Sequence, residues 1–138
     1  MGFVVSDESL PKGVLRLVRY EGEEEEVVIP EGIQIIGRKA FAHNQHLRRV
    51  ELPEGLEVVG IAAFENCTSL EELWLPDSLT TLDYKAFLGC DNLKRLSIPA
   101  GIDPHSGPTE LYGGCPLKAV RLRGPVSRLI HWALGRGF

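Results

Sequence analysis

The fold is decided by three consecutive blocks of 23 residues: VIPEGIQIIGRKAFAHNQHLRRV (residues 28–50), ELPEGLEVVGIAAFENCTSLEEL (51–73) and WLPDSLTTLDYKAFLGCDNLKRL (74–96). The same interval separates four prolines: Pro30, Pro53, Pro76 and Pro99. It also separates the second residues of three Ala-Phe pairs: Phe41, Phe64 and Phe87. A period in the twenties with fixed apolar positions predicts a solenoid, in which one coil buries its apolar face only by stacking on its neighbours.

Each block supplies the parts of one coil. The segment before each proline alternates apolar and polar residues and predicts a short strand, which proline ends because it cannot donate to a ladder. A second pair of aliphatic residues predicts an inward-facing segment on the far side of the coil: Ile33/Ile36, Leu56/Val59 and Leu79/Leu82. Gly37 and Gly60 predict a turn after it, with Asp83 in that place in the third block. The Ala-Phe pair predicts a helical or 3₁₀ turn, and its phenylalanines a stacked ladder in the core.

The spacing of the aliphatic residues resembles a leucine-rich repeat. The pattern L-x-x-L-x-L occurs four times, at Leu47/Val50/Leu52, Leu70/Leu73/Leu75, Leu93/Leu96/Ile98 and Leu117/Val120/Leu122. The proline after the last aliphatic residue, and the Ala-Phe pair with Asn or Cys three places on, make the chain similar to the BspA-type leucine-rich repeat family of bacteria. The resemblance implies a protein-interaction solenoid, with some members acting as surface adhesins. It brings no catalytic residues, because none are known for the repeat itself.

The expected fold is therefore a single leucine-rich repeat domain, α/β to mainly β, with about four 23-residue coils and a parallel sheet. Residues 1–27 contain two strand-like stretches and predict an N-terminal β-hairpin cap that hides the open edge of the first coil. The repeats occupy residues 28–122. Residues 103–114 depart from the pattern, and this segment is either a functional loop or a drifting terminal repeat. Residues 123–138 place aliphatic side chains at helical spacing and predict a C-terminal helical cap.

Composition narrows the class of protein. The formal net charge is −4, and 25% of the residues are charged. This mildly acidic balance does not match a nucleic-acid binder, which needs a clustered basic face. No apolar run approaches the roughly 20 residues of a membrane span, so membrane insertion is not expected. The first residues lack the basic and apolar regions of a signal peptide. We expect a cytoplasmic protein as the sequence stands, or a cell-surface one if a leader was removed.

Residues that could carry chemistry do not form a catalytic or metal motif. Cys67, Cys90 and Cys115 share one repeat position, which Asn44 fills in the first block. We expect buried free thiols, although strand spacing alone does not exclude a disulfide. The sequence contains no C-x-x-C pair that would suggest zinc and no G-x-S-x-G nucleophile motif. We therefore expect no enzyme activity, no metal site and no cofactor.

Two histidines and four carboxylates have alternative interpretations. His43 and His46 lie in the turn of the first block, where the other blocks hold Asn66 and Ser69, then Gly89 and Asn92. They are either surface residues of a tolerant turn or a metal pair. The acidic run at residues 23–26 is either a solvated turn or a site for a cation or a basic partner.

The outward face of the strands is the candidate binding surface. Its columns alternate in charge from coil to coil and contain one exposed aromatic position, Trp74. The predicted partner-binding residues are Arg49, Glu51, Glu72, Trp74, Arg95, Ser97 and Arg121. The charges either pair between coils and fix the stacking register, or present a pattern to a charged protein partner. Trp is among the residues most enriched at binding hot spots, and an outward Trp has no packing duty within its strand.

Three functions remain open at this point. The first is a non-enzymatic scaffold that binds a protein partner of unknown identity and possibly forms homo-oligomers. The second is a carbohydrate-binding or adhesive module that uses Trp74 as a stacking platform. The third is a structural repeat fragment of a larger protein with no ligand of its own.

Overall fold

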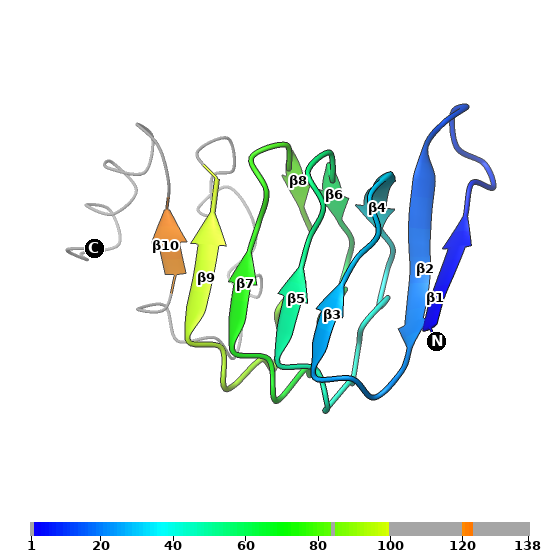
Figure 1. The fold of residues 1–138 in the computed structure, drawn as a ribbon. Coiled ribbons are helices and arrows are strands. Elements are labelled where there is room, and N and C mark those ends of the chain that lie inside the picture. The colour runs from blue at the N-terminus through cyan, green and yellow to red at the C-terminus, as the bar shows by residue number, and fades with distance from the viewer. Residues whose placement is uncertain (1, 84, 100–119, 123–138) are drawn as a thin grey trace.

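The computed structural model describes residues 2–83, 85–99 and 120–122, and it is a β-solenoid built from two facing sheets (Figure 1). The first sheet has the strand order β10-β9-β7-β5-β3, and the second has the order β1-β2-β4-β6-β8. The strands are β1 (Gly2–Ser6), β2 (Leu15–Glu21), β3 (Glu26–Val28), β4 (Ile33–Ile36), β5 (Arg49–Glu51), β6 (Val58–Val59), β7 (Glu72–Trp74), β8 (Thr81–Leu82), β9 (Arg95–Ile98) and β10 (Val120–Leu122). Among the described residues there is no helix, so the fold is mainly β.

The 23-residue period sets the register of the first sheet. Strands β3, β5, β7 and β9 run parallel, and each residue lies beside its counterpart 23 positions later, as Val27 does beside Val50. Successive side chains of a strand point to opposite faces. The central residues of β3, β5 and β7 are buried, while the flanking residues of β3 and β5 are exposed. The predicted strands before each proline are confirmed.

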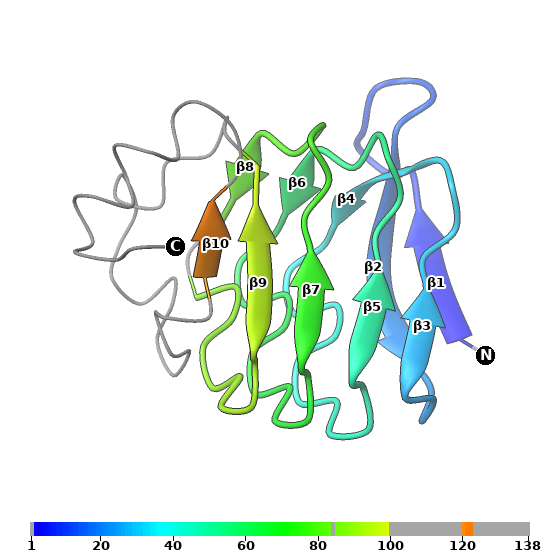
Figure 2. The same cartoon turned by 60° about the vertical axis from the view of Figure 1, so that its left-hand side comes forward.

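The far side of each coil is also a hydrogen-bonded sheet. The predicted aliphatic segments form β4, β6 and β8, which pair in parallel with the same 23-residue offset, Ile36 beside Val59 and Val59 beside Leu82 (Figure 2). Gly37 and Gly60 end β4 and β6 where neighbouring coils approach closely. A Cβ at Gly60 would lie 2.8 Å from the carbonyl oxygen of Ile36, which is main chain. The glycine is needed here for space rather than for a left-handed conformation.

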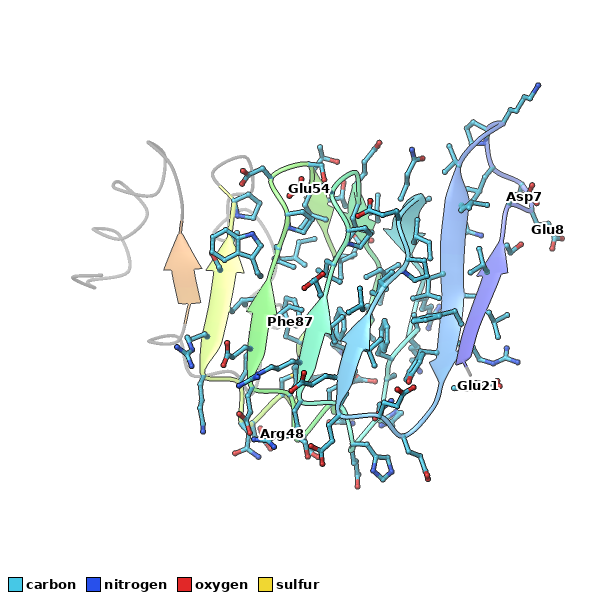
Figure 3. All side chains as sticks on the ribbon, in the orientation of Figure 1. Asp7, Glu8, Glu21, Arg48, Glu54 and Phe87 are labelled. Atoms are coloured by element: carbon cyan, nitrogen blue, oxygen red, sulfur yellow. The ribbon has the colours of Figure 1, made fainter. Side chains whose placement is uncertain are left out.

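An aromatic ladder runs through the core between the two sheets. Phe41 and Phe64 stack with ring centroids 5.0 Å apart, and Phe64 and Phe87 follow at 5.7 Å. All three rings are buried, as predicted, and Phe87 is labelled among the side chains in Figure 3. The ladder continues into the N-terminal hairpin, since Tyr20 lies 5.5 Å from Phe41 and Phe3 lies 5.2 Å from Tyr20.

The segment around each Ala-Phe pair is a series of tight turns, and the predicted helical turn is absent from the described residues. Successive backbone N–H groups in this segment alternate between partners within the same turn and partners in the next coil. Those of Ala40 and Ala42 bond to carbonyls three residues back, while that of Phe41 bonds to the carbonyl of Ala63 in the next coil at 2.8 Å. A helix would need every N–H for bonds within the segment. The left-handed conformation of Lys39 (φ 57°) and His43 (φ 65°) also interrupts right-handed helical winding.

The predicted N-terminal hairpin is present, but it covers the first coil only in the second sheet and does not hide the edge of β3, because the hairpin pairs with β4. Strands β1 and β2 pair antiparallel, and β2 then pairs in parallel with β4. The hairpin therefore extends the second sheet, and β3 remains the first strand of the other sheet. Strand β3 begins at Glu26, within the stretch expected to form the cap. The predicted C-terminal helical cap and the irregular segment 103–114 lie outside the described residues.

Candidate functional site

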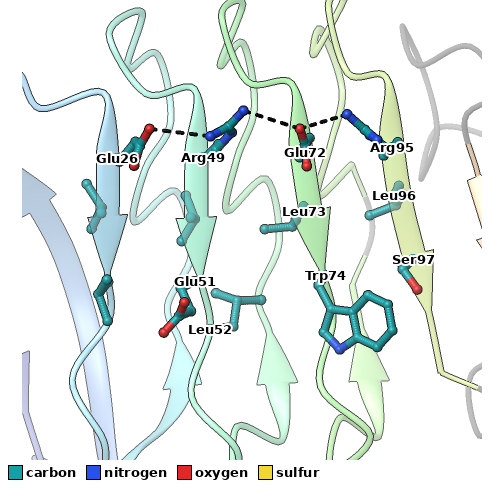
Figure 4. Close-up of a pocket in the computed structure, with 13 residues that line it drawn as sticks. Glu26, Arg49, Glu51, Leu52, Glu72, Leu73, Trp74, Arg95, Leu96 and Ser97 are labelled. Atoms are coloured by element: carbon teal, nitrogen blue, oxygen red, sulfur yellow. Dashed lines mark hydrogen bonds and ion pairs between the residues drawn. The ribbon is translucent and has the colours of Figure 1, made fainter.

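The outward face of the first sheet contains a groove with a volume of about 520 Å³ (Figure 4). We call it the strand-face groove. Its lining comes from four adjacent strands and the residue that follows β5: Glu26, Val27, Val28, Arg49, Val50, Glu51, Leu52, Glu72, Leu73, Trp74, Arg95, Leu96 and Ser97. Six of the seven predicted partner-binding residues are brought together there. The seventh, Arg121, belongs to β10, whose side chains lie outside the described residues.

One edge of the groove is a row of alternating charges. Arg49 lies 3.5 Å from Glu26 on one side and 3.6 Å from Glu72 on the other, measured between guanidinium nitrogens and carboxylate oxygens. The guanidinium of Arg95 donates to the same oxygen of Glu72 at 3.0 Å. Two glutamates and two arginines thus neutralise one another across four strands. The prediction that these charges pair between coils is confirmed.

A second row of charges lies just before the strands. Arg48 donates two hydrogen bonds to Glu71, at 2.9 and 3.1 Å, and its guanidinium lies 3.6 Å from Glu25. The hydrogen bonds and charge of Arg48 hold the pKa of the Glu71 carboxyl below its usual value, and those of Glu71 raise the pKa of Arg48.

The acidic run 23–26 belongs to these rows. Glu25 and Glu26 occupy the positions one period before Arg48 and Arg49, so they act as the acidic members of a first coil. Glu23 faces His46 at 3.8 Å, and the Tyr20 hydroxyl donates to Glu24 at 3.3 Å. The four carboxylates therefore point to different partners and, among the described residues, do not converge on a cation site. No group of three or more metal-ligating side chains occurs in that part of the chain.

The other edge of the groove is apolar and aromatic. Val28 and Trp74 are 63% and 60% exposed, respectively, and they flank Glu51 in the order of the strands. Leu52 is half-buried, although the residues at its position in neighbouring coils, Ile29 and Leu75, are fully buried. The exposed carboxylate of Glu51 has no ion-pair partner among the described residues. This edge thus combines exposed apolar surface with a single uncompensated negative charge.

The irregularity at Leu52 has a visible backbone cause. The N–H of Ile29 donates to the carbonyl of Glu51 at 3.0 Å, and the N–H of Leu75 donates to that of Ser97 at 3.0 Å. In the described structure the equivalent bond from Leu52 to Trp74 is not formed. The backbone pairing of β5 with β7 therefore ends one hydrogen bond earlier than the pairing of β3 with β5 or of β7 with β9. Sequence reasoning missed this position because Leu52 fits the repeat pattern as well as its counterparts do.

The cysteines and histidines that the structure describes do not form a reactive site. Cys67 and Cys90 are buried, and each thiol donates to a main-chain carbonyl of the preceding coil at 3.1 Å. Burial raises the pKa of Cys67 to about 12, which makes this thiol a poor nucleophile. Cys115 lies outside the described residues. His43 lies 3.3 Å from the Asn66 side chain at the same turn position, where both residues have the left-handed conformation.

The family follows from the repeat. The family model of the BspA type leucine rich repeat region matches six copies over residues 20–134. The chain is a BspA-type leucine-rich repeat protein. Proteins of this family and fold are typically non-enzymatic, and leucine-rich repeats generally mediate protein interactions. Within the described residues, no helix has the length and apolar character needed to cross a membrane.

Solved structures show the same fold. A leucine-rich repeat protein from Bacteroides capillosus is 26% identical and superposes with a TM-score of 0.71, covering 81% of this chain and 88% of its own. A leucine-rich cell surface protein from Faecalibacterium prausnitzii is 23% identical, with a TM-score of 0.61 over 93% of this chain and 40% of its own. The chain thus spans well under half of that second protein. No protein of curated function matches the sequence at a significant level.

Proposed function

We propose that this BspA-type repeat protein is a non-enzymatic scaffold that binds a protein partner in the strand-face groove. The observation that supports this most is the 60% exposure of Trp74 on the apolar edge of the groove. An exposed indole forfeits the stabilisation that its large apolar surface would gain from burial. Trp is also among the residues most often found at the energetic centre of an interface.

The chemistry of the groove indicates the kind of partner. The row from Glu26 to Arg95 is internally paired, so it offers a polar rim with little net charge. The apolar edge offers Val28 and Trp74 on either side of the Glu51 carboxylate. A protein surface with a basic side chain between two apolar ones would match it. An apolar centre with a polar rim is the usual anatomy of a protein interface.

The test is the variant Trp74→Ala, with Ile61→Ala as the matched control. Ile61 is 42% exposed but does not line the groove. Each variant is used beside the wild type to capture partners from lysate of the native host, and the melting temperature of each is recorded. We expect Trp74→Ala to weaken association by about 2 kcal/mol or more, as a hot-spot residue does, with no loss of melting temperature.

Two results would contradict the proposal. If Trp74→Ala lowers the melting temperature by several degrees and leaves association unchanged, Trp74 is a packing residue. If Ile61→Ala weakens association equally, the groove is not the binding surface.

A carbohydrate or adhesive ligand is the second candidate, because an exposed indole beside a free carboxylate offers a stacking face and a hydrogen-bond acceptor for a sugar. A glycan array probed with the wild type and with Trp74→Ala distinguishes the two. Glycan binding that depends on Trp74, with no protein captured, would favour the carbohydrate function.

A further inference from the structure

The two sheets do not end together at the N-terminal side of the solenoid. Strand β2 pairs with β4, which lies in the same coil as β3, so β1 and β2 extend the second sheet two strands beyond that coil. The first sheet stops at β3. Figure 1 shows β1 and β2 lying past β3, and among the described residues no strand pairs with β3 on that side. The end of the solenoid is therefore a step, which we call the N-terminal step.

The open edge of β3 presents unused backbone groups. In a parallel ladder, alternate residues of a strand bond to one neighbouring strand, and the residues between them face the other way. The carbonyl of Glu25 accepts from Arg49 and the N–H of Ile29 donates to Glu51, so Glu25, Val27 and Ile29 face β5. The N–H and C=O groups of Glu26 and Val28 thus point to the open edge. An exposed strand edge of this kind can accept a further strand.

The hairpin wall of the step is apolar. Val5 lies opposite Leu17, and Phe3 lies opposite Tyr20, in the antiparallel ladder. Directly opposed residues of such a ladder share one face, and Leu17 and Tyr20 are buried in the core. Val5 therefore points toward the interior side of the hairpin, yet it is 41% exposed, and Phe3 is only half-buried. A further strand beside β3 would lie across from them and remove this apolar surface from water.

The charge rows specify what the further strand should carry. Within the solenoid, the acidic Glu72 lies between two arginines, Arg49 and Arg95. At the open end, and among the described residues, Glu26 forms an ion pair only with Arg49, and Glu25 only with Arg48. By comparison with Glu72, a further strand beside β3 should place one basic residue next to Glu25 and another next to Glu26. In the chain's own strands, such a basic pair is followed by alternating aliphatic residues, as in Arg48-Arg49-Val50-Glu51-Leu52.

We propose that the N-terminal step binds an extended segment of a partner protein, which adds to β3 as a parallel strand. Its sequence has two basic residues followed by alternating aliphatic ones. The basic residues face Glu25 and Glu26, the backbone bonds to Glu26 and Val28, and the aliphatic side chains cover Phe3 and Val5. This site does not include Trp74. It shares Glu26 and Val28 with the groove but uses the open backbone edge of β3 and the hairpin wall.

The test uses peptides copied from the chain itself. The probe is the peptide HLRRVELP, which copies residues 46–53. Within the chain this sequence contains β5, which pairs in parallel with the acidic strand β7 on the side nearer the N-terminal end of the solenoid. Binding to the full chain is followed by backbone amide NMR. We expect the Glu26 and Val28 amides to shift and to exchange more slowly with water. The charge-reversed peptide HLEEVELP should bind at least about tenfold more weakly, since like charges would then face each other.

Two methylated peptides test the backbone pairing. Arg48 and Val50 face β7 in the chain's own ladder, because the carbonyl of Arg48 accepts from Glu71 and the register alternates from there. A peptide methylated on the nitrogen equivalent to that of Val50 loses a donor to the open edge and should bind at least about tenfold more weakly. A peptide methylated at the equivalent of Glu51, which faces the other way, should bind like the parent.

Variants of the protein test whether the peptide binds at the N-terminal step. Val5→Ser should weaken peptide binding severalfold, while Ile61→Ser and Trp74→Ala should leave it unchanged, with the melting temperature of each variant recorded as a folding control. Equal binding of the two methylated peptides, or amide shifts confined to β5, β7 and β9, would overturn the proposal. So would a peptide-free chain that forms dimers and loses them in Val5→Ser, because the step would then hold a second copy.

Discussion

The interior of the solenoid repeats from coil to coil, whereas the outward face of the same strands does not. The inward positions hold Val27, Val50, Leu73 and Leu96, which are all buried aliphatic residues. The outward positions beside them hold valine, glutamate, tryptophan and serine in turn. The interior must be similar in every coil because each coil packs on the next. The outward face is free of that constraint, so specific recognition can reside there.

This contrast predicts that the largest losses of stability come from the interior and from its middle. Phe64 is fully buried and stacks on a ring at each side. Truncating a buried phenylalanine costs about 3–5 kcal/mol, against a total of about 5–15 kcal/mol for a domain. We expect Phe64→Ala to lower the free energy of unfolding by that amount, measured by urea denaturation.

The matched variant is Phe3→Ala, at the N-terminal end of the same ladder. Phe3 is half-buried, and the only aromatic ring that it contacts among the described residues is that of Tyr20. Its truncation should cost clearly less than that of Phe64. Equal costs would mean that the ladder is not the reason for the stability of the middle coils.

The second prediction concerns a buried thiol of the interior. Burial raises the pKa of Cys67 from 9.0 to about 12. Because the folded state binds the thiol proton more tightly than the unfolded state, this group's stabilisation is complete below pH 9 and is lost as the pH rises from 9 to 12. In that range this thiol lowers the free energy of unfolding by roughly 1.4 kcal/mol for each unit of pH increase.

The measurement is the free energy of unfolding at pH 7, 9 and 10 for the wild type and Cys67→Ala. The difference between the two proteins isolates this thiol from other groups that titrate in alkali. We expect the wild type to lose about 1 kcal/mol more than the variant between pH 9 and pH 10. In the native wild type, Cys67 and Cys90 should also resist alkylation until denaturant is added. Parallel pH curves, or fast labelling of the native protein, would show that these thiols are accessible to water.

The interior was predictable from the sequence because it is periodic. The ladder of Phe41, Phe64 and Phe87 and the buried thiols follow from one interval. The extension of the ladder to Tyr20 was not predictable in this way, because Tyr20 precedes Phe41 by 21 residues and the hairpin replaces a regular coil. The second sheet was expected only as an aliphatic segment, since two-residue strands such as β6 leave no alternation to detect.

The outward face was predictable in position but only partly in detail. Six of the predicted partner-binding residues line one groove, since alternation along a strand determines which side chains point outward. The pairing of Glu25 and Glu26 with the basic coil could have been found by applying the 23-residue interval one block earlier. The partial exposure of Leu52 could not, because Leu52 fits the repeat pattern as well as its counterparts do, and the pattern does not encode the backbone hydrogen bond in which it differs from them.

The smallest expected effect belongs to the charge row of the outward face. One oxygen of Glu72 receives both Arg95 at 3.0 Å and Arg49 at 3.6 Å. Glu72→Gln keeps the size of the side chain but removes its charge, which leaves two guanidinium groups without the anion between them. Exposed ion pairs contribute about 0.2–1 kcal/mol each, so we expect a loss of roughly 1 kcal/mol in the free energy of unfolding at low salt.

Salt dependence decides whether this loss is electrostatic. In 1 M salt the screening length falls to about 3 Å, so the difference between wild type and Glu72→Gln should largely disappear. The control is Glu57→Gln, because Glu57 is exposed and its carboxylate makes no ion pair among the described residues. This variant should match the wild type at both salt concentrations. A loss in Glu72→Gln that persists in 1 M salt would mean that Glu72 acts through packing. The outward face would then share the structural duty of the interior, and the separation between a stabilising core and a recognising surface would be weaker than the geometry indicates.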